Sequence, residues 1–211
     1  KPIQLTAQQQ QMRDSGNKFA FHLFQTINEE IDDGSSIIVA PLSIAYLLGM
    51  LNTGADGQTR QQITDVMGLG NSVQEINNYF KKMMDEAPLV DPTVTVHIAN
   101  CIDANSALGI SLIPHYKLDM QLYYNAQIDA LDFTKSSSLD IINNWCKNNT
   151  DGMIPTILDE ISPIAVMYLM NAIYFNASWT EKFDPKDTHE MNFTMPDGST
   201  VQRMLMHSKT L

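Results

Sequence analysis

Cysteine is scarce in this sequence, which contains only Cys101 and Cys146. A disulfide-stapled secreted scaffold needs a dense, even series of cysteines, and a zinc or redox site needs closely paired ones, so both classes are excluded. Nothing in the sequence brings the two residues within disulfide range, and we expect two free thiols. The cysteine content does not indicate whether the protein works in an oxidising or a reducing compartment.

Positive charge and long apolar runs are also scarce. The chain has 13 Lys and Arg against 24 Asp and Glu, a net charge of −11. A basic patch would lie in an acidic field, so we expect no nucleic-acid partner. The longest apolar run, residues 37–51, is interrupted by Pro41, Ser43 and Gly49. It is too short for a membrane-spanning segment.

Motifs of common enzyme classes are missing as well. The sequence has no GxSxG, HExxH or GxxxxGK, and Gly68 and Gly70 lack the third glycine of GxGxxG. Its histidines show no metal-ligand spacing and are interpreted as surface or satisfied core residues: His22, His97, His115, His189 and His207. We therefore predict no catalytic residue, no metal site and no cofactor.

Hydrophobic residues make up 44% of the 211 residues, enough for a substantial core. Apolar spacing predicts helices over 11–31 (ending near Gly34), 41–51, 58–68, 72–86, 113–124 and 138–149. Alternation or short apolar runs predict strands over 36–41, 93–103, 126–133 and 165–175, and a hairpin over 189–206 that turns at residues 196–198. The elements do not alternate as βαβ units, which favours the α+β class.

Methionine is abundant, with 13 residues. Met83, Met84, Met204 and Met206 are clustered enough to suggest either core filling or a soft binding surface, and core filling is the favoured interpretation.

One residue interrupts the most apolar strand, AVMYLMNAIYFNASW, at 165–179. The run from Ala165 to Phe175 is typical of a strand buried on both faces. Asn171 places an amide in its middle, where unmade hydrogen bonds would cost about 1–3 kcal/mol. The amide is either satisfied locally, with no mechanical role, or part of a polar cluster that can exchange its hydrogen bonds.

Four segments in order resemble the serpin family: IIVAPLSIAYLLGMLNTGADGQTRQQI, NNWCKNNTDGMI, VMYLMNAIYFNASWTEKFDP and FTMPDGSTVQRMLM. The resemblance covers essentially the whole chain and a little more than the N-terminal half of a usual serpin. It implies an α+β serpin fold, with helices packed on a large central mixed β-sheet and further smaller sheets. Residues 1–211 would be the N-terminal portion of one serpin domain, with the reactive loop and C-terminal strands outside this chain.

The resemblance also implies roles for individual residues. It places Ser43 and Asn171 in the shutter, under the middle of the central sheet, and Trp179 at the breach, where the sheet first opens. Further family positions are matched by Gly54, Ala55, Gly57, Thr59, Asn144, Trp145, Thr150, Gly152, Phe183, Phe193 and Met206. The chain departs from the family at Ser36 (usually Asn), Ala40 (usually a capping Ser), and Asn176 with Ala177 (usually Lys and Gly).

The function implied by the resemblance is inhibition of a serine, or also a cysteine, protease by insertion of the cleaved reactive loop into the central sheet. The expected partners are the target protease and the C-terminal remainder of the same protein. The alternative is a non-inhibitory carrier, chaperone or storage protein, and an enzyme is the third hypothesis. The resemblance implies an extracellular or cell-envelope location, and no signal peptide opens the sequence.

Overall fold

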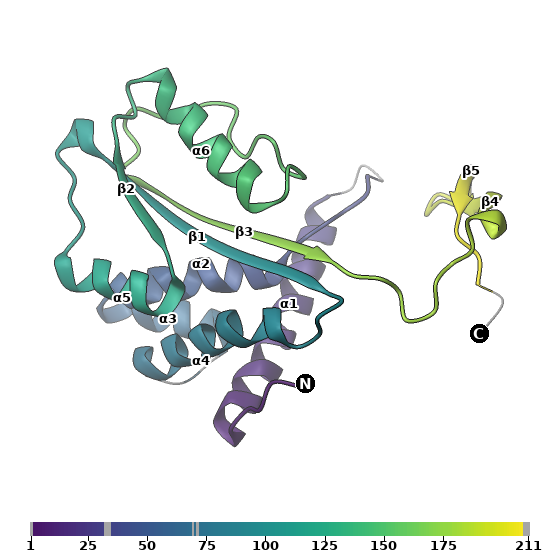
Figure 1. Cartoon of the computed structure of the whole chain (residues 1–211), viewed down its shortest axis with the longest axis horizontal. Helices are drawn as coiled ribbons and strands as arrows, with labels where there is room; N and C mark the ends of the chain where they lie inside the picture. The colour runs from purple at the N-terminus through teal and green to yellow at the C-terminus, as the bar shows by residue number, and fades with distance from the viewer. Residues whose placement is uncertain (1, 32–34, 69, 71, 209–211) are drawn as a thin grey trace.

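The computed structural model describes residues 2–31, 35–68, 70 and 72–208. A three-stranded sheet lies between helices on its two faces (Figure 1). The helices are α1 (Ala7–Glu30), α2 (Pro41–Gly54), α3 (Gly57–Met67), α4 (Val73–Glu86), α5 (Pro114–Tyr124) and α6 (Ser136–Asn149). The strands are β1 (Thr95–Asn105), β2 (Gln127–Leu131), β3 (Met167–Asn176), β4 (His189–Thr194) and β5 (Thr200–Leu205). Short 3-10 turns follow α4, β1 and the segment after β3: η1 (Ala87–Leu89), η2 (Ser106–Leu108) and η3 (Pro185–Asp187).

The main sheet is mixed, with the order β2-β1-β3. Strand β1 is parallel to β2, with Asp103 opposite Asp129, and antiparallel to β3, with Asn100 opposite Asn171. Strands β4 and β5 form a separate antiparallel pair. The α+β class, with helices on a mixed sheet and a second smaller sheet, is therefore confirmed.

The two faces of β1 pack into different cores because successive side chains of a strand point to opposite faces. Ile102 belongs to the core between the sheet and helices α1–α5, together with Tyr46, Phe80 and Tyr124. Cys101 belongs to the core between the sheet and α6, whose other buried members are Ile142, Trp145, Cys146, Met170 and Ala172. The central strand is thus buried on both sides.

The structure confirms the prediction for the cysteines and only part of the prediction for the methionines. Both cysteines are buried and free, as predicted. Met83 and Met84 pack against the core of α1–α5, so core filling is confirmed for them. Met204 and Met206 are exposed, so core filling is wrong for this pair.

Local sequence explains where the helices begin. The side chains of Thr6 and Ser72 each accept a hydrogen bond from the backbone N–H of the third helical residue. The side chains of those residues, Gln9 and Glu75, accept one from the backbone N–H of Thr6 and Ser72, which completes two capping boxes. Pro41 occupies the first turn of α2, as predicted, while Ala40 supplies no side-chain cap. Helix α1 ends at Glu30, and the predicted end near Gly34 lies outside the described residues.

Two strand predictions need correction. Residues 36–40 form no strand, because no segment in the described ranges pairs with them, and Ile38 is 97% exposed. The strand at 165–175 exists as β3, but it lies at the edge of the sheet and Phe175 is 68% exposed. An apolar run indicates that a strand needs to be buried. It does not indicate that the element that buries the strand lies within the same part of the chain.

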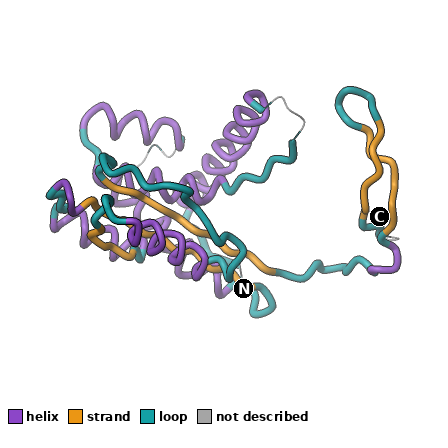
Figure 2. The backbone as a smooth tube through the Cα atoms, turned by 90° about the horizontal axis from the view of Figure 1, so that it is seen from above, coloured by secondary structure: helices purple, strands orange, loops and turns teal. Residues whose placement is uncertain are grey.

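The β4–β5 hairpin stands apart from the rest of the molecule (Figures 1 and 2). It is joined to β3 by an extended segment, and every residue of β4 is exposed. The turn runs through residues 196–198, as the sequence predicted, with Gly198 at a φ of 82°. The hairpin therefore depends on its own ladder and on contacts that this part of the chain does not provide.

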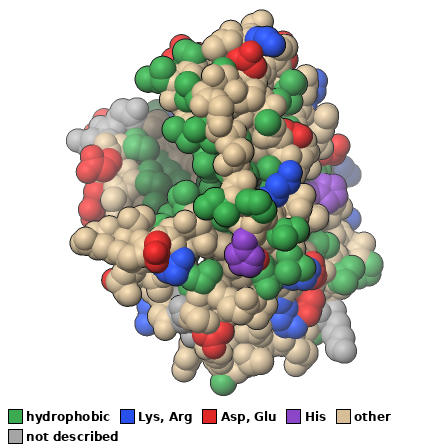
Figure 3. All heavy atoms as spheres, turned by 90° about the vertical axis from the view of Figure 1, so that its left-hand side faces the viewer, with side chains coloured by type: hydrophobic (Ala, Val, Ile, Leu, Met, Phe, Trp, Pro, Cys, Tyr) green, Lys and Arg blue, Asp and Glu red, His purple; other side chains and the backbone are tan. Residues whose placement is uncertain are grey.

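Large apolar side chains remain uncovered on several elements. The most exposed include Ile38 (97%), Ile164 (81%), Phe21 (77%) and Phe175 (68%). Figure 3 shows hydrophobic side chains exposed at several places on one face of the molecule, some of them in a hollow. None of the helices within the described ranges is both long enough and apolar enough to cross a membrane.

We predict that residues 1–211 expressed alone do not reach a cooperative native state. The edge of β3 and these apolar side chains are left without cover, which favours association and dye binding. Thermal melting, light scattering and hydrophobic-dye fluorescence of the fragment test this, with the full-length protein as control. A sharp, monomeric melt of the fragment without dye binding would show that its core is sufficient.

Candidate functional site

The amide that interrupts β3 meets a second amide on β1. Asn100 and Asn171 are paired in register, and Asn171 Nδ2 donates to Asn100 Oδ1 at 2.9 Å. Asn100 is buried, and its own Nδ2 donates to the backbone carbonyl of Tyr124 at 2.8 Å. The two side chains thus bridge the seam between the strands and continue to the end of α5.

The hydrogen bonding of Asn171 is incomplete. Its Oδ1 is buried and accepts no hydrogen bond from the described residues. An unmade bond of this kind costs about 1–3 kcal/mol. Strand β3 has no ladder partner on its far side within the described ranges, so the donor that Asn171 Oδ1 lacks would come from a segment outside them.

The polar contacts extend from Tyr124 into the helices. Tyr124 Oη donates to Asn77 Oδ1 at 2.7 Å, and Thr53 Oγ1 donates to the same oxygen at 2.9 Å. Burial raises the pKa of the Tyr124 phenol, so the hydroxyl stays a neutral donor. These hydrogen bonds link the junction of β1 and β3 to α4 through Asn77 and to α2 through Thr53. We call Asn171, Asn100, Tyr124 and Asn77 the polar seam.

The three predicted site residues are not all brought together. Ser43 is half-buried on α2, a helix that packs against β3, but no side-chain hydrogen bond joins Ser43 to Asn171 among the described residues. Trp179 lies beyond the end of β3 and is 65% exposed, with its ring edge-to-face against Phe183 at 5.6 Å. Asn171 therefore lies in the sheet, Ser43 on an adjacent element, and Trp179 outside it.

Sequence reasoning missed Asn100, Asn77 and Tyr124. Asn100 had a usable signal, because it interrupts the alternating face of Val94, Val96, Ile98 and Ile102 just as Asn171 interrupts β3. Asn77 and Tyr124 had none, since both lie on helices whose facing partners are distant in sequence.

Other family positions have visible structural reasons. At Gly54 an added Cβ would lie 2.9 Å from the Tyr116 ring, so only glycine allows this close approach. Thr150 is buried, and its hydroxyl donates to the Cys146 carbonyl at 2.9 Å and accepts from the Ile154 amide at 3.1 Å. These residues fix the ends of α2 and α6.

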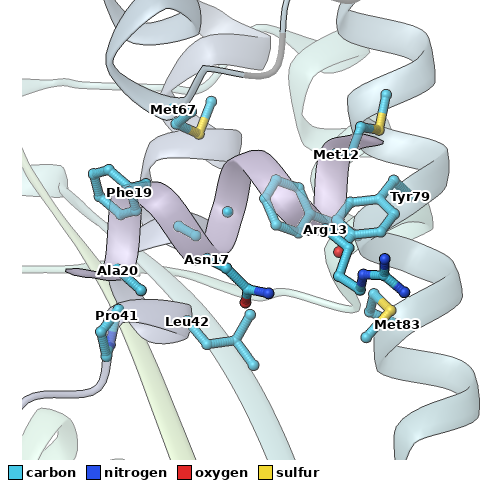
Figure 4. Close-up of a pocket in the computed structure, with 13 residues that line it drawn as sticks. Met12, Arg13, Asn17, Phe19, Ala20, Pro41, Leu42, Met67, Tyr79 and Met83 are labelled. Atoms are coloured by element: carbon cyan, nitrogen blue, oxygen red, sulfur yellow. The ribbon is translucent and has the colours of Figure 1, made fainter. Parts of the chain in front are cut away.

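A cavity of about 270 Å³ lies between α1 and helices α2–α4 (Figure 4). Its lining is mainly apolar, including Met12, Phe19 and Met83, with Arg13 and Asn17 as polar members. Arg13 donates to the neighbouring Asp14 at 2.8 Å. The lining of this cavity does not pair a nucleophile with a base, so it does not suggest a catalytic site.

The sequence model of the family described as serpin (serine protease inhibitor) matches residues 14–211. The chain belongs to the serpin family. It is 30% identical over 204 residues to leukocyte elastase inhibitor A of Mus musculus, covering 95% of this chain and 53% of that serpin. It is 28% identical over 198 residues to the corticosteroid-binding globulin of Pongo abelii, covering 92% of this chain and 48% of that protein.

Solved structures agree with this assignment. The thermophilic serpin tengpin in its latent state matches with a TM-score of 0.79 and 30% identity, over 94% of this chain and 52% of that one. A loop C-sheet serpin polymer matches with a TM-score of 0.81 and 30% identity, over 96% and 52%. The chain thus spans about half the length of the serpins it matches.

In the full-length serpin, we predict that Asn100 and Asn171 are energetically coupled. Asn100→Ala and Asn171→Ala should each lower the free energy of unfolding by about 1–3 kcal/mol. The double variant should lose less than the sum, with a coupling of about 0.5–3 kcal/mol, because both changes remove the same hydrogen bond. Denaturant unfolding of the four proteins gives this number.

The exposed Asn192→Ala on β4 is the control and should change stability by about 0.5 kcal/mol or less. Additive losses for Asn100→Ala and Asn171→Ala would mean that their contact contributes nothing of its own.

Proposed function

We propose that the full-length serpin containing this chain inhibits a serine protease, or also a cysteine protease, by trapping it as a covalent acyl-enzyme. The observation that carries the proposal is the match of the serpin (serine protease inhibitor) family model to residues 14–211. The amide pair across β1 and β3 suits a sheet whose strands exchange hydrogen-bond partners. The relationship to leukocyte elastase inhibitor A supports the same activity.

In the proposed mechanism the reactive loop, in the part of the protein outside this chain, is attacked as a substrate. The protease serine oxygen, or cysteine sulfur, bonds to the scissile carbonyl carbon, the peptide bond breaks, and the new amine leaves with a proton. The cleaved loop then enters the main sheet as a strand. A protease displaced in this way loses its oxyanion-hole geometry, so the acyl bond is not hydrolysed.

Insertion of the cleaved loop as a strand is energetically favourable. Strand β3 has 10 residues. An added strand of this length would make roughly ten ladder hydrogen bonds at about 1 kcal/mol each, a gain on the order of 10 kcal/mol before the ordering entropy is subtracted. The closed form would therefore be metastable relative to the inserted one.

Within this mechanism, Asn171 and Ser43 serve the shutter and Trp179 the breach. Asn171 supports its role through the bond to Asn100 and the free Oδ1, which permit one partner to be exchanged for another. Ser43 acts through the packing of α2 against β3. Trp179 would mark the place where the sheet first opens, and its exposure leaves room for a segment that covers it.

A second candidate is a non-inhibitory carrier. It is favoured by the similarity to corticosteroid-binding globulin, at an identity close to that of the inhibitor. We further propose an extracellular or cell-envelope location for the protein, in line with the family. The fold would be shared by inhibitor and carrier, and the reactive loop would distinguish them.

The expected result for an inhibitor is a complex that survives boiling in detergent, because the acyl bond is covalent. The full-length protein is mixed with a panel of serine and cysteine proteases and analysed by denaturing gel electrophoresis and intact-mass measurement. A protease whose nucleophile has been blocked is the matched control and should give no complex. Loop cleavage without a stable complex across the panel would reject inhibition and direct attention to the carrier.

A further inference from the structure

The face of the sheet under α6 contains a buried carboxylate, Asp103. It is 2% exposed, and its Oδ1 accepts no hydrogen bond from the described residues. Asp103 shares its face with Cys101, which belongs to the core beneath α6, while Ile102 between them faces the other helices. Figure 1 shows α6 lying over this side of the sheet. A carboxylate here has been removed from water without a full set of partners.

A second carboxylate lies beside it. Asp129 of β2 pairs directly with Asp103 in the parallel register. Leu131, two residues further along β2, packs in the core beneath α6, so Asp129 points to the same face. Gln127 Nε2 donates to Asp129 Oδ2 at 2.6 Å. Asp129 is only half-buried, so its negative charge lies beside a carboxyl group that has been removed from water, and ionisation of Asp103 next to it is costly.

No ion pair neutralises the two carboxylates among the described residues. Within the described ranges neither carboxylate takes part in an ion pair. Other titratable groups on this face include Cys101 on β1, Tyr168 opposite Asp103 on β3, and Cys146 on the buried face of α6. Lys117 of α5 borders a hollow that Asp129 also lines, and Asp140 and Lys147 of α6 are exposed.

Burial raises the pKa of Asp103 from 3.8 to about 6, the charge of Asp129 adds to the rise, and a hydrogen bond with the Cys101 thiol opposes it. Asp103 is therefore protonated at pH 5 and ionised at pH 8. Because its pKa is higher in the packed state than in water, this packing gains stability at low pH and loses it as the pH rises through about 6. Movement of α6 away from the sheet would hydrate the carboxylate and return its pKa toward the ordinary value.

We propose that Asp103 and Asp129 form a pH-dependent release for α6, which holds the helix on the sheet in mildly acidic conditions and loosens it at neutral pH. The local surroundings of the pair come from this chain, since β1 has a neighbour on each side and α6 covers the face. The release itself does not depend on inhibition. One consequence does rest on the proposed function: if α6 must move to admit the inserting strand, insertion would be faster at neutral pH.

Hydrogen exchange in the full-length protein measures the release directly. Samples at pH 5, 6, 7 and 8 are compared after correction for the intrinsic exchange rate. Protection of residues 136–149 should fall by about tenfold from pH 5 to pH 8, because the linked loss of stability is confined to the interval between the ordinary pKa of 3.8 and the raised pKa of about 6, and only part of that interval lies above pH 5. In Asp103→Asn, which imitates the protonated acid, protection should stay high and independent of pH.

Asp140→Asn, which removes an exposed carboxylate from α6 itself, is the matched control and should keep the wild-type profile. Asp129→Asn should shift the midpoint to lower pH, because one cause of the raised pKa is gone, and it serves as the test if Asp103→Asn does not fold. An unchanged profile in Asp103→Asn, or an unchanged midpoint in Asp129→Asn, would overturn the proposal. Exchange is measured without protease, so the release and the inhibitory function can fail separately.

Discussion

The hydrogen bond between Asn171 and Asn100 sets the arrangement on which the rest of the structure depends. It joins β1 and β3 at a position where the two amides lie directly opposite each other. A slip of one residue would point Asn171 to the other face and leave the half-buried Asn171 and the buried Asn100 without each other, at about 1–3 kcal/mol per unmade bond. The register of the seam, and through Tyr124 the position of α5, are therefore tied to one polar contact in an apolar sheet.

The two faces of β1 have opposite character. On the face toward α1–α5, Asn100 is buried and takes part in hydrogen bonds with Asn171 and Tyr124. On the face toward α6, Asp103 is equally buried, but its Oδ1 has no hydrogen-bond partner among the described residues and it lies opposite Asp129. The Asn171–Asn100 bond joins the two strands on the first face, even though Asn171 Oδ1 accepts no hydrogen bond from the described residues, whereas the buried carboxylate weakens the packing of the second face. In the proposed inhibitor, the polar contacts on the first face would hold β1 and β3 together, and the carboxylates on the second face would allow α6 to move away from the sheet.

Much of this architecture could be predicted from local sequence, and the reasons differ by element. The helices α2–α6 and strand β1 were predicted because their apolar spacing has a clear period, and Asn171 was found because it breaks one. Pairing of β1 with β3 joins residues 71 apart in sequence, as in the Asn171–Asn100 bond, so neither the register nor the polar seam could be read locally. The strand predicted over 36–41 is wrong because its apolar residues have no pairing partner among the described residues. Asp103 was not singled out because a lone acid in an alternating strand usually faces water.

The most direct test of the central claim compares two states of the full-length serpin. The intact protein and the loop-cleaved protein are melted with and without Asn171→Ala, and polymer formation of the intact form is followed on mild heating. If the amide holds strands that separate during insertion, the substitution should lower the melting temperature of the intact form more than that of the cleaved form, and polymers should form faster. Equal losses in both states, with unchanged polymerisation, would contradict the account and make Asn171 an ordinary satisfied core amide.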